Sequence, residues 1–354
     1  RLSLVGSEMC IRDRAIAAVR KEFIGMRERL DAGEGTLEKQ LQEKLRPLSR
    51  RVFAPIDAAA GGSRRWVVCP DGDLWLLPWQ MLLTDGGDYV VQDYVLRYAI
   101  TGRDLGVGSA TPRRASRPLV LANPNYDLRF RGGPAPAKTP GVPQGMISRG
   151  FSKGLPLGNV EALPASIAEA AAIQPRLMKY AGIEPEMLDQ DAALESAIKS
   201  AKAPRVLHLS THGFFLPNEI GDGLRLPENP LLRCGLLFAG CNDAVNAPVD
   251  SDDGVLTGLE IVGLNLHGTD LVVLSACETA LGDVHRGEGV AGLRQSFHLA
   301  GARSVVASAW KVPDDDTALL MVGLFDSLAA GKPTHESLRE AQLDAIKQRR
   351  AAYN

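Results

Sequence analysis

Two residue types that can form a catalytic pair each follow an apolar run of this sequence. His212 comes directly after residues 204–211, and Cys277 comes directly after residues 271–276. Short apolar runs predict buried strands, so both side chains are expected just past a strand end. A histidine titrates near neutral pH and can generate the thiolate that acts as a nucleophile. The pattern favours a nucleophile–base pair, although a buried structural cysteine beside a loop histidine would give the same pattern.

Two backbone amides complete this candidate site. Gly213 has no side chain to obstruct its N–H, and this group and the N–H of Cys277 could together bind a developing oxyanion. The remaining histidines and cysteines carry no such pattern: His208 lies inside its strand and is expected to be a hydrogen-bonded core residue. No spacing suggests a convergent set of zinc ligands, so no metal and no cofactor is expected.

The elements that must position these residues alternate between apolar strands and helices. This order predicts an α/β fold with a mostly parallel central sheet and helices on both faces. Sites in such sheets collect at the carboxyl ends of the strands. The strands are expected at 119–122, 204–211, 271–276 and 304–309, and the helices at 161–180, 191–202, 288–300, 315–330 and 334–348.

The part of the chain before this core is expected to have three sections. Residues 1–14 include a stretch that resembles a translated sequencing-adapter artefact, which suggests a truncated N-terminus and a missing upstream domain. Residues 15–50 predict two amphipathic helices ending near Pro47, which could be the end of a repeat region. Residues 51–105 predict a β-hairpin around the Asp71-Gly72 turn and a strand at 94–100.

The core itself is expected over residues 106–350. It contains residues 131–158, where 7 glycines and 5 prolines predict a mobile insert.

Composition excludes several classes of protein. The chain has 354 residues, 45% of them hydrophobic and 23% charged, which is typical of a globular protein with a sizeable core. The net charge of −2 and the aromatic content of 5% predict no nucleic-acid partner. No apolar run approaches the roughly 18 residues of a membrane span. Five cysteines without a C-x-x-C pair indicate a reducing compartment, so a cytoplasmic protein is expected.

Six segments of the chain together resemble the CHAT domain, a caspase-like cysteine peptidase family often joined to tetratricopeptide repeats in bacteria. The two segments that contain His212 and Cys277 are highly specific as a pair. The resemblance covers about residues 45–345. Its segments are DGDLWLLPWQML (71–82), VLHLSTHGFF (206–215), DGVLTGLEI (253–261), LVVLSACETALG (271–282), GEGVAGLRQSFHLAGARSVVASAWKV (287–312) and LMVGLFDSLAAGK (320–332).

The resemblance implies a role for each motif residue. His212 would be the general base and Cys277 the nucleophile, with the amides of Gly213 and Cys277 as the oxyanion hole. It implies a caspase-like fold and peptide-bond hydrolysis through a thioester. No third carboxylate is required in this clan.

The sequence indicates the substrate-binding residues less specifically than it indicates the catalytic pair. Analogy with caspase-like pockets implies Asn123, Asp127, Ser275 and Asp314. Asp314 lies in a run resembling the W-x-V-T-D segment of separases, which cleave after arginine, but Pro313 replaces the threonine. Asp314–Asp316 could equally cap the next helix.

Two further segments carry hypotheses of their own. The acidic loop 243–253 contains Asp250, Asp252 and Asp253, which could bind calcium or simply face solvent. The insert 131–158, with Arg149 and Lys153, could be a self-cleavage site or a substrate lid.

Three functions are therefore compared. The first is a regulated cysteine endopeptidase, with a peptide or protein substrate and a possible tetratricopeptide-repeat partner. The second is a catalytically silent module that binds proteins. The third is a hydrolase that uses the same pair on a small ester or amide. The presence of both His212 and Cys277 favours an enzyme.

Overall fold

The computed structural model describes residues 37–70, 74–75, 77–100, 116–130, 159–216, 219–220, 224–225, 229–248, 251–275, 288–308 and 314–353. The predicted adapter-like stretch, the first predicted N-terminal helix and the insert 131–158 lie outside these residues, as does Cys277. The chain divides into two compact units, one formed by residues 1–108 and 335–354 and the other by residues 109–334. In the described part, no helix is long and apolar enough to cross a membrane.

A five-stranded sheet forms the centre of the larger unit. Its strand order is β12-β11-β5-β3-β4 and every neighbouring pair is parallel. The strands are β3 (Leu119–Pro124), β4 (Glu186–Gln190), β5 (Val206–Ser210), β11 (Leu271–Leu274) and β12 (Val305–Ala307). The four strands expected from the sequence are confirmed. The edge strand β4 was not predicted, because it is largely exposed and has no apolar run.

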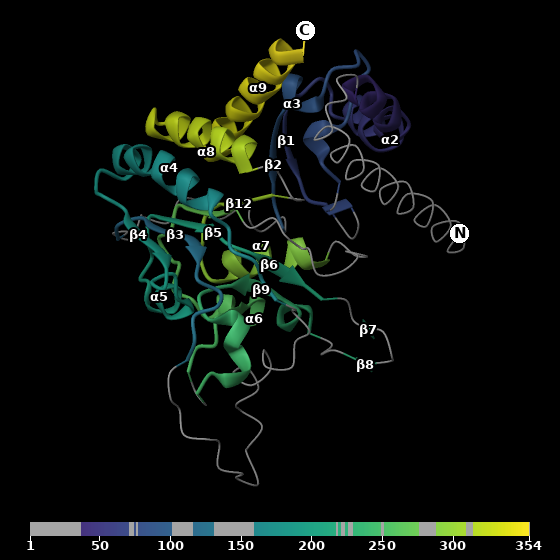
Figure 1. The fold of residues 1–354 in the computed structure, drawn as a ribbon. Helices are drawn as coiled ribbons and strands as arrows, with labels where there is room; N and C mark the ends of the chain where they lie inside the picture. The colour runs from purple at the N-terminus through teal and green to yellow at the C-terminus, as the bar shows by residue number, and fades with distance from the viewer. Residues whose placement is uncertain are drawn as a thin grey trace. The chain divides into compact units, whose positions relative to one another are not determined.

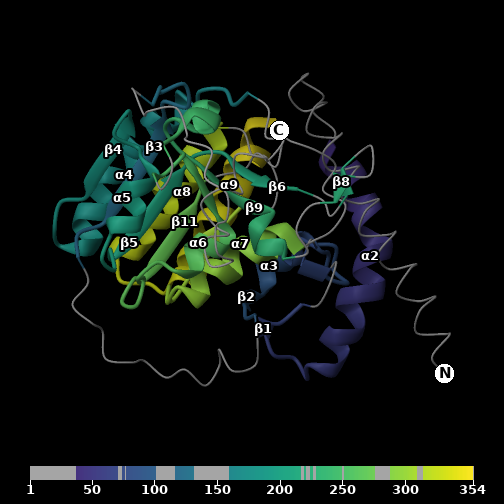
Figure 2. The same ribbon diagram turned by 90° about the horizontal axis from the view of Figure 1, so that it is seen from below.

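Helices cover both faces of this sheet (Figure 1). One side carries α4 (Ala165–Ala181) and α8 (Asp314–Ala329), which pack against each other. The opposite side carries α5 (Glu195–Ser200), α6 (Gly258–Val262) and α7 (Glu288–Leu299). The caspase-like α/β sandwich expected from the sequence is therefore confirmed. Figure 2 shows β4, β5 and β11 from below, on the side of α5 and α6.

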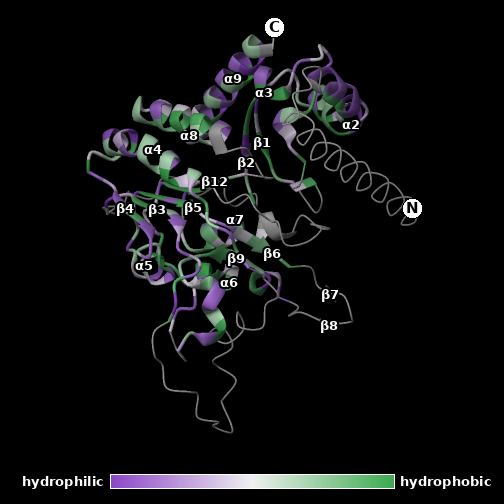
Figure 3. Ribbon diagram, viewed as in Figure 1, coloured by the Kyte–Doolittle hydropathy of each residue, from purple (hydrophilic) through white to green (hydrophobic). Residues whose placement is uncertain are grey.

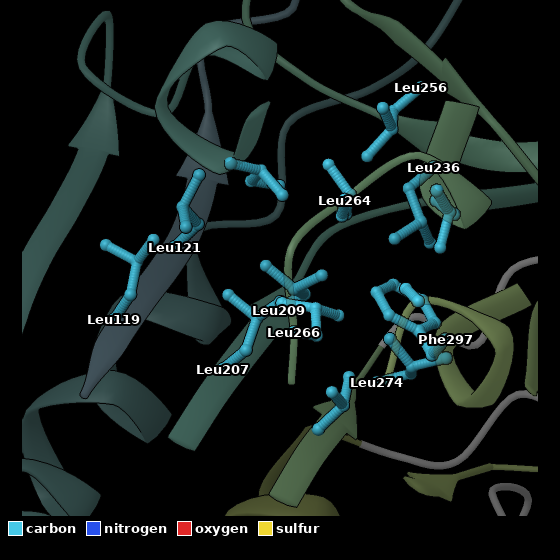
Figure 4. Close-up of a cluster of buried hydrophobic side chains, with 14 of the residues drawn as sticks. Leu119, Leu121, Leu207, Leu209, Leu236, Leu256, Leu264, Leu266, Leu274 and Phe297 are labelled. Atoms are coloured by element: carbon cyan, nitrogen blue, oxygen red, sulfur yellow. The ribbon is translucent and has the colours of Figure 1, made fainter. Parts of the chain in front are cut away.

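The main hydrophobic core lies between the sheet and the second group of helices (Figure 4). Alternate residues of each strand face this core because strand side chains point to opposite faces in turn. The labelled side chains include Leu121, Leu209, Leu274 and Phe297. The other face of the sheet presents a row that is in register across three strands, formed by Val120, His208 and Val273.

A second, antiparallel sheet extends the larger unit. It has the order β10-β9-β6, with β6 (Gly213–Phe215), β9 (Cys234–Leu237) and β10 (Val255–Thr257). Gly235 is required in β9, because a Cβ atom there would overlap the carbonyl oxygen of Leu256. The remaining short elements are β7 (Glu219–Ile220), β8 (Leu224–Arg225), η6 (Pro230–Leu232) and η7 (Cys241–Asn246).

The smaller unit corrects two sequence predictions. The expected hairpin is wrong, because β1 (Arg65–Val68) pairs in parallel with β2 (Val95–Tyr98), and residues 74–75 form a turn of 3-10 helix. The physical reason is packing: Leu77 and Trp79 enter an apolar cluster around Phe53 and Tyr94.

The helix that was expected to end near Pro47 is the second correction. It is α2 (Leu37–Ala59), which runs through Pro47 and Pro55. A proline inside a helix removes a hydrogen bond and is costly. Burial of Leu45, Leu48 and Phe53 on either side of these prolines compensates for that cost.

The remaining helices of the smaller unit are short or hydrophilic. They are η2 (Trp79–Met81), α3 (Val90–Asp93) and α9 (Thr334–Tyr353). Arg339 of α9 donates hydrogen bonds to the carbonyl groups of Val91, Gln92 and Tyr94 and so caps the end of α3. Hydrophilic residues predominate along α9 in Figure 3, whereas hydrophobic residues recur along α8.

Lys199 binds one aspartate of the acidic loop that was a candidate calcium site. Its amine lies 2.5 Å from Glu195, 2.8 Å from Asp252 and 3.0 Å from Glu260. Glu195 also accepts the N–H groups of residues 253 and 254. Asp253 instead accepts the N–H of residue 255. The two described aspartates of the calcium hypothesis are thus engaged within the protein, and Asp250 lies outside the described residues.

Replacement of Lys199 by methionine should destabilise the protein, because the Glu195 side chain is only 2% exposed and would lose its counter-charge. We expect Lys199→Met to lower the free energy of unfolding in urea by about 3 kcal/mol at pH 8. Burial already raises the pKa of Glu195 to about 7, while the hydrogen bond from Lys199 opposes that shift.

Loss of the lysine should raise this pKa further. A carboxyl whose pKa is raised by folding favours the folded state at low pH, and this contribution is lost as the pH rises through the folded pKa. The loss of unfolding free energy in Lys199→Met, relative to the wild type, should therefore be smaller at pH 5.5 than at pH 8. The exposed Lys202→Met is the matched control; an equal loss in both variants would contradict the assignment.

Candidate active site

His212 lies two residues after the end of β5, at the carboxyl edge of the sheet. The side chain is buried, and its Nε2 atom is 2.9 Å from the backbone carbonyl oxygen of Glu161. A carbonyl oxygen can only accept, so Nε2 carries the proton and donates it to this bond. In the neutral imidazole the lone pair is then on Nδ1, which is the nitrogen that can act as a base.

Tyr126 holds the backbone of His212 from the end of β3. Its hydroxyl oxygen accepts the N–H of His212 at 3.3 Å and lies 3.0 Å from Oγ1 of Thr211. Thr211 donates its own hydroxyl proton to the carbonyl of Leu237, so the Tyr126 hydroxyl must donate to Thr211. The tyrosine ring also packs on the imidazole, with 5.4 Å between centroids. Burial raises the pKa of Tyr126, which keeps this hydroxyl protonated.

Two asparagines hold the segment that supplies the Glu161 carbonyl. Asn242 accepts the N–H of Val160 at 2.9 Å and donates to the carbonyl of the same residue at 3.0 Å. Asn123 accepts the N–H of Leu163 at 2.9 Å. The irregular segment 160–163 is therefore bound on both sides of Glu161 by side-chain amides. These bonds fix the position of the carbonyl that orients His212.

Two predicted substrate residues, Asn123 and Asp127, participate in this network. Asn123 is buried, with a φ of 45°, and its carbonyl accepts a hydrogen bond from Gln190. Asparagine tolerates this left-handed conformation better than most residues. Asp127 accepts the remaining N–H of the Asn242 amide at 2.8 Å. In this structure both residues support the His212 network.

Gly213, the predicted oxyanion residue, is the first residue of β6. The N–H of Leu237 donates to the carbonyl of His212, and the N–H of Leu216 donates to that of Arg233. In an antiparallel pair, every second residue of a strand is hydrogen-bonded to its partner strand. His212 and Leu216 are such residues toward β9. Gly213 is opposite Leu236 at a position between them, so its N–H points away from β9.

Ser275, the third predicted substrate residue, is anchored at the end of β11. Its N–H donates to the carbonyl of Leu209 in β5 at 2.9 Å. Its hydroxyl donates to the carboxylate of Glu169 in α4 at 3.0 Å, and the other oxygen of that carboxylate is 2.9 Å from Nε2 of His208. The expectation that His208 is a hydrogen-bonded core residue is confirmed.

The last two predicted site residues lie at the limits of the described chain. Cys277 lies outside it, two residues beyond Ser275. Asp314 is the first residue of α8, where a carboxylate favours the helix dipole, and its side chain is not among those described. Because β5 and β11 are parallel neighbours, His212 and Ser275 both follow strands that end at the same edge of the sheet, and Cys277 is two residues beyond Ser275 in the sequence.

The described thiols differ from a catalytic cysteine. Cys234 and Cys241 are buried, and burial raises the pKa of each to about 12. Cys69 is exposed. In the described part of the chain, no group of three or more His, Cys, Asp or Glu side chains could hold a metal ion.

Several residues of this site were not predicted from the sequence, among them Asn242, whose side-chain amide binds Val160. Tyr126 lies between two residues that were predicted, but an aromatic residue in a loop carries no signal beyond a contribution to the core. Thr211 and Glu169 looked like ordinary strand and helix residues. Glu161 acts through its backbone, which has no residue type to recognise.

Known proteins resemble this chain over most of its length. A family model described as "CHAT domain" matches residues 42–353. The chain is 24% identical over 327 residues to "Tetratricopeptide repeat protein 28" of Mus musculus and 23% identical over 317 residues to the protein of the same name from Homo sapiens. Each match covers 84% of this chain but only 12% of the relative.

Removal of the Tyr126 hydroxyl should destabilise the folded protein. In Tyr126→Phe the buried N–H of His212 loses its acceptor and Thr211 loses its donor. We expect the free energy of unfolding in urea to fall by about 1–3 kcal/mol. The control Tyr98→Phe removes a part-buried hydrogen bond to Gln80 and should cost about 1 kcal/mol or less. Equal stability of Tyr126→Phe and the wild type would contradict this role.

Proposed function

The chain belongs to the CHAT domain family, which is related to caspase-like peptidases, and on this premise we propose that it is a cysteine endopeptidase. His212 is the general base and Cys277 the nucleophile. The amides of Gly213 and Cys277 form the oxyanion hole.

The proposed reaction uses the orientation of His212. Nδ1 of His212 takes the proton of the Cys277 thiol, and the thiolate attacks the carbonyl carbon of a peptide bond. The oxyanion accepts hydrogen bonds from the amides of Gly213 and Cys277. The intermediate collapses to a thioester, and the leaving amine takes the proton from His212. A water molecule, deprotonated by His212, then hydrolyses the thioester.

The single observation that carries the proposal is the hydrogen bond from Nε2 of His212 to the Glu161 carbonyl. It fixes the tautomer with a basic Nδ1 and holds the ring at the edge where β11 ends. A module that only binds partners needs neither a fixed tautomer nor an oriented ring. The geometry therefore favours the enzyme over the catalytically silent module.

The substrate is proposed to be a peptide or protein, recognised near Asp127 and Asp314, since the hydroxyl of Ser275 is already bound by Glu169. Asp314 would pair with a basic side chain through charge-assisted hydrogen bonds. Asn123 would contribute by holding Leu163. A cytoplasmic setting suits a thiol nucleophile. We also propose that a tetratricopeptide-repeat segment regulates the peptidase and that the peptidase acts as a bacterial effector.

Peptidase activity should depend on both catalytic residues. We expect Cys277→Ala and His212→Ala each to lower kcat/KM by about 10³-fold or more against a fluorogenic peptide library, because each removes a member of one catalytic unit. Cys69→Ala is the control, since this cysteine is exposed and far from the motifs in sequence. Hydrolysis that persists in Cys277→Ala would exclude the proposed nucleophile. Cleavage of esters but of no peptide would indicate the small-molecule hydrolase instead.

Alkylation should separate the cysteines at neutral pH. With a pKa of about 12, less than about one in 10³ of the Cys234 and Cys241 thiols is ionised at pH 8. We expect iodoacetamide to label Cys277 first and to leave these two unmodified in the folded protein, as read by peptide mass spectrometry. In urea all five cysteines should react. Labelling of Cys234 as fast as of Cys69 in the folded protein would contradict the burial argument.

A further inference from the structure

Glu169 links the two strands that lead to the proposed catalytic residues. It projects from α4 and receives hydrogen bonds from His208 in β5 and from Ser275 at the end of β11. His208 lies four residues before His212, and Ser275 lies two residues before Cys277. One carboxylate thus contacts both strands that lead to the site.

The surroundings of this carboxylate are apolar. His208 is fully buried between Val120 and Val273 in the register of the sheet, and its ring centroid is 6.1 Å from that of Phe325 in α8. Glu169 is 5% exposed. Within the described residues, Nδ1 of His208 has no hydrogen-bond partner.

Burial of these polar groups is a poor way to stabilise a sheet. A carboxylate and an imidazole lose their hydration here, and apolar residues of similar volume would often be neutral or stabilising. The arrangement therefore points to a requirement for position rather than for stability.

We propose that Glu169 is a positioning residue for the active site. Its carboxylate fixes Ser275 against β5 and thereby sets where the segment carrying Cys277 begins relative to His212. This inference rests on the proposed function.

The geometry explains why a second anchor is useful at Ser275. The backbone of Ser275 is already bound to Leu209 through one hydrogen bond. A single bond leaves rotation at Ser275, which directly follows β11 and lies two residues before Cys277 in the sequence. The side-chain bond to Glu169 restrains that rotation. Displacement of a catalytic group by about 1 Å can cost about 100-fold in rate.

The test compares Glu169→Ala, Glu169→Gln, Ser275→Ala and the double alanine variant in the full chain. Glutamine keeps the shape: its oxygen can accept from His208, and its amide can donate to the Ser275 hydroxyl. The exposed Glu184→Ala is the matched control. The readouts are kcat and KM on a cleaved peptide, the alkylation rate of Cys277 by iodoacetamide, and the melting temperature.

We expect Glu169→Ala and Ser275→Ala each to lower kcat about 10- to 100-fold with little change in KM. The double variant should lose no more than the worse single variant, since both remove the same hydrogen bond. Glu169→Gln should recover kcat to within about 5-fold of the wild type, and alkylation of Cys277 should slow in parallel with kcat.

Several results would overturn the proposal. An unchanged kcat in a folded Glu169→Ala variant would exclude the proposed anchor. So would a loss of kcat in the double variant equal to the product of the two single losses. A raised KM with normal kcat in Ser275→Ala would make this residue a substrate contact instead. Faster alkylation in both Glu169 variants would indicate that the charge of Glu169 matters and not its position.

Failure of the proposed peptidase function can be distinguished from failure of the positioning role of Glu169. A wild-type chain that cleaves no peptide would overturn the peptidase. The alkylation rate needs no substrate, so it would still test Glu169: an unchanged rate in Glu169→Ala would overturn the positioning role.

Discussion

The hydrogen bond between Nε2 of His212 and the carbonyl of Glu161 is the interaction on which the rest of the site depends. A carbonyl has no proton to give, so this bond selects one tautomer and one ring orientation. It can exist only if an irregular segment is held still. The amides of Asn123 and Asn242 bind that segment on both sides, and Tyr126 binds the backbone of the histidine itself.

Buried polar groups are used in the same way at other points of the larger unit. Glu195 binds the backbone at residues 253 and 254, and Glu169 binds the end of β11. Each buried carboxylate or amide holds a segment that lacks the regular hydrogen bonds of a helix or sheet. The hydrophobic core supplies the stability of the sandwich, and these groups decide where its irregular segments lie.

Errors in the sequence-based prediction of the fold had physical causes. Continuous apolar runs predicted β3, β5, β11 and β12, because strands buried on both faces must be apolar. The edge strand β4 has no such run and was missed. The apolar residues after Val68 suggested a hairpin, but Leu77 and Trp79 pack into a cluster without forming a strand. Local turn signals could not show that β1 would pair with a strand about 30 residues away.

The sequence by itself predicted four of the five strands of the central sheet, the α/β sandwich, and the position of His212 just after a strand. These follow from local patterns, since burial dictates residue type along each strand. The tertiary structure alone decided which atoms hold His212 and Ser275. His212 meets a backbone carbonyl 51 residues away, and Ser275 meets a carboxylate 106 residues away. Such contacts leave no local pattern, because a carbonyl is common to every residue and a buried glutamate resembles any other until the chain has folded around it.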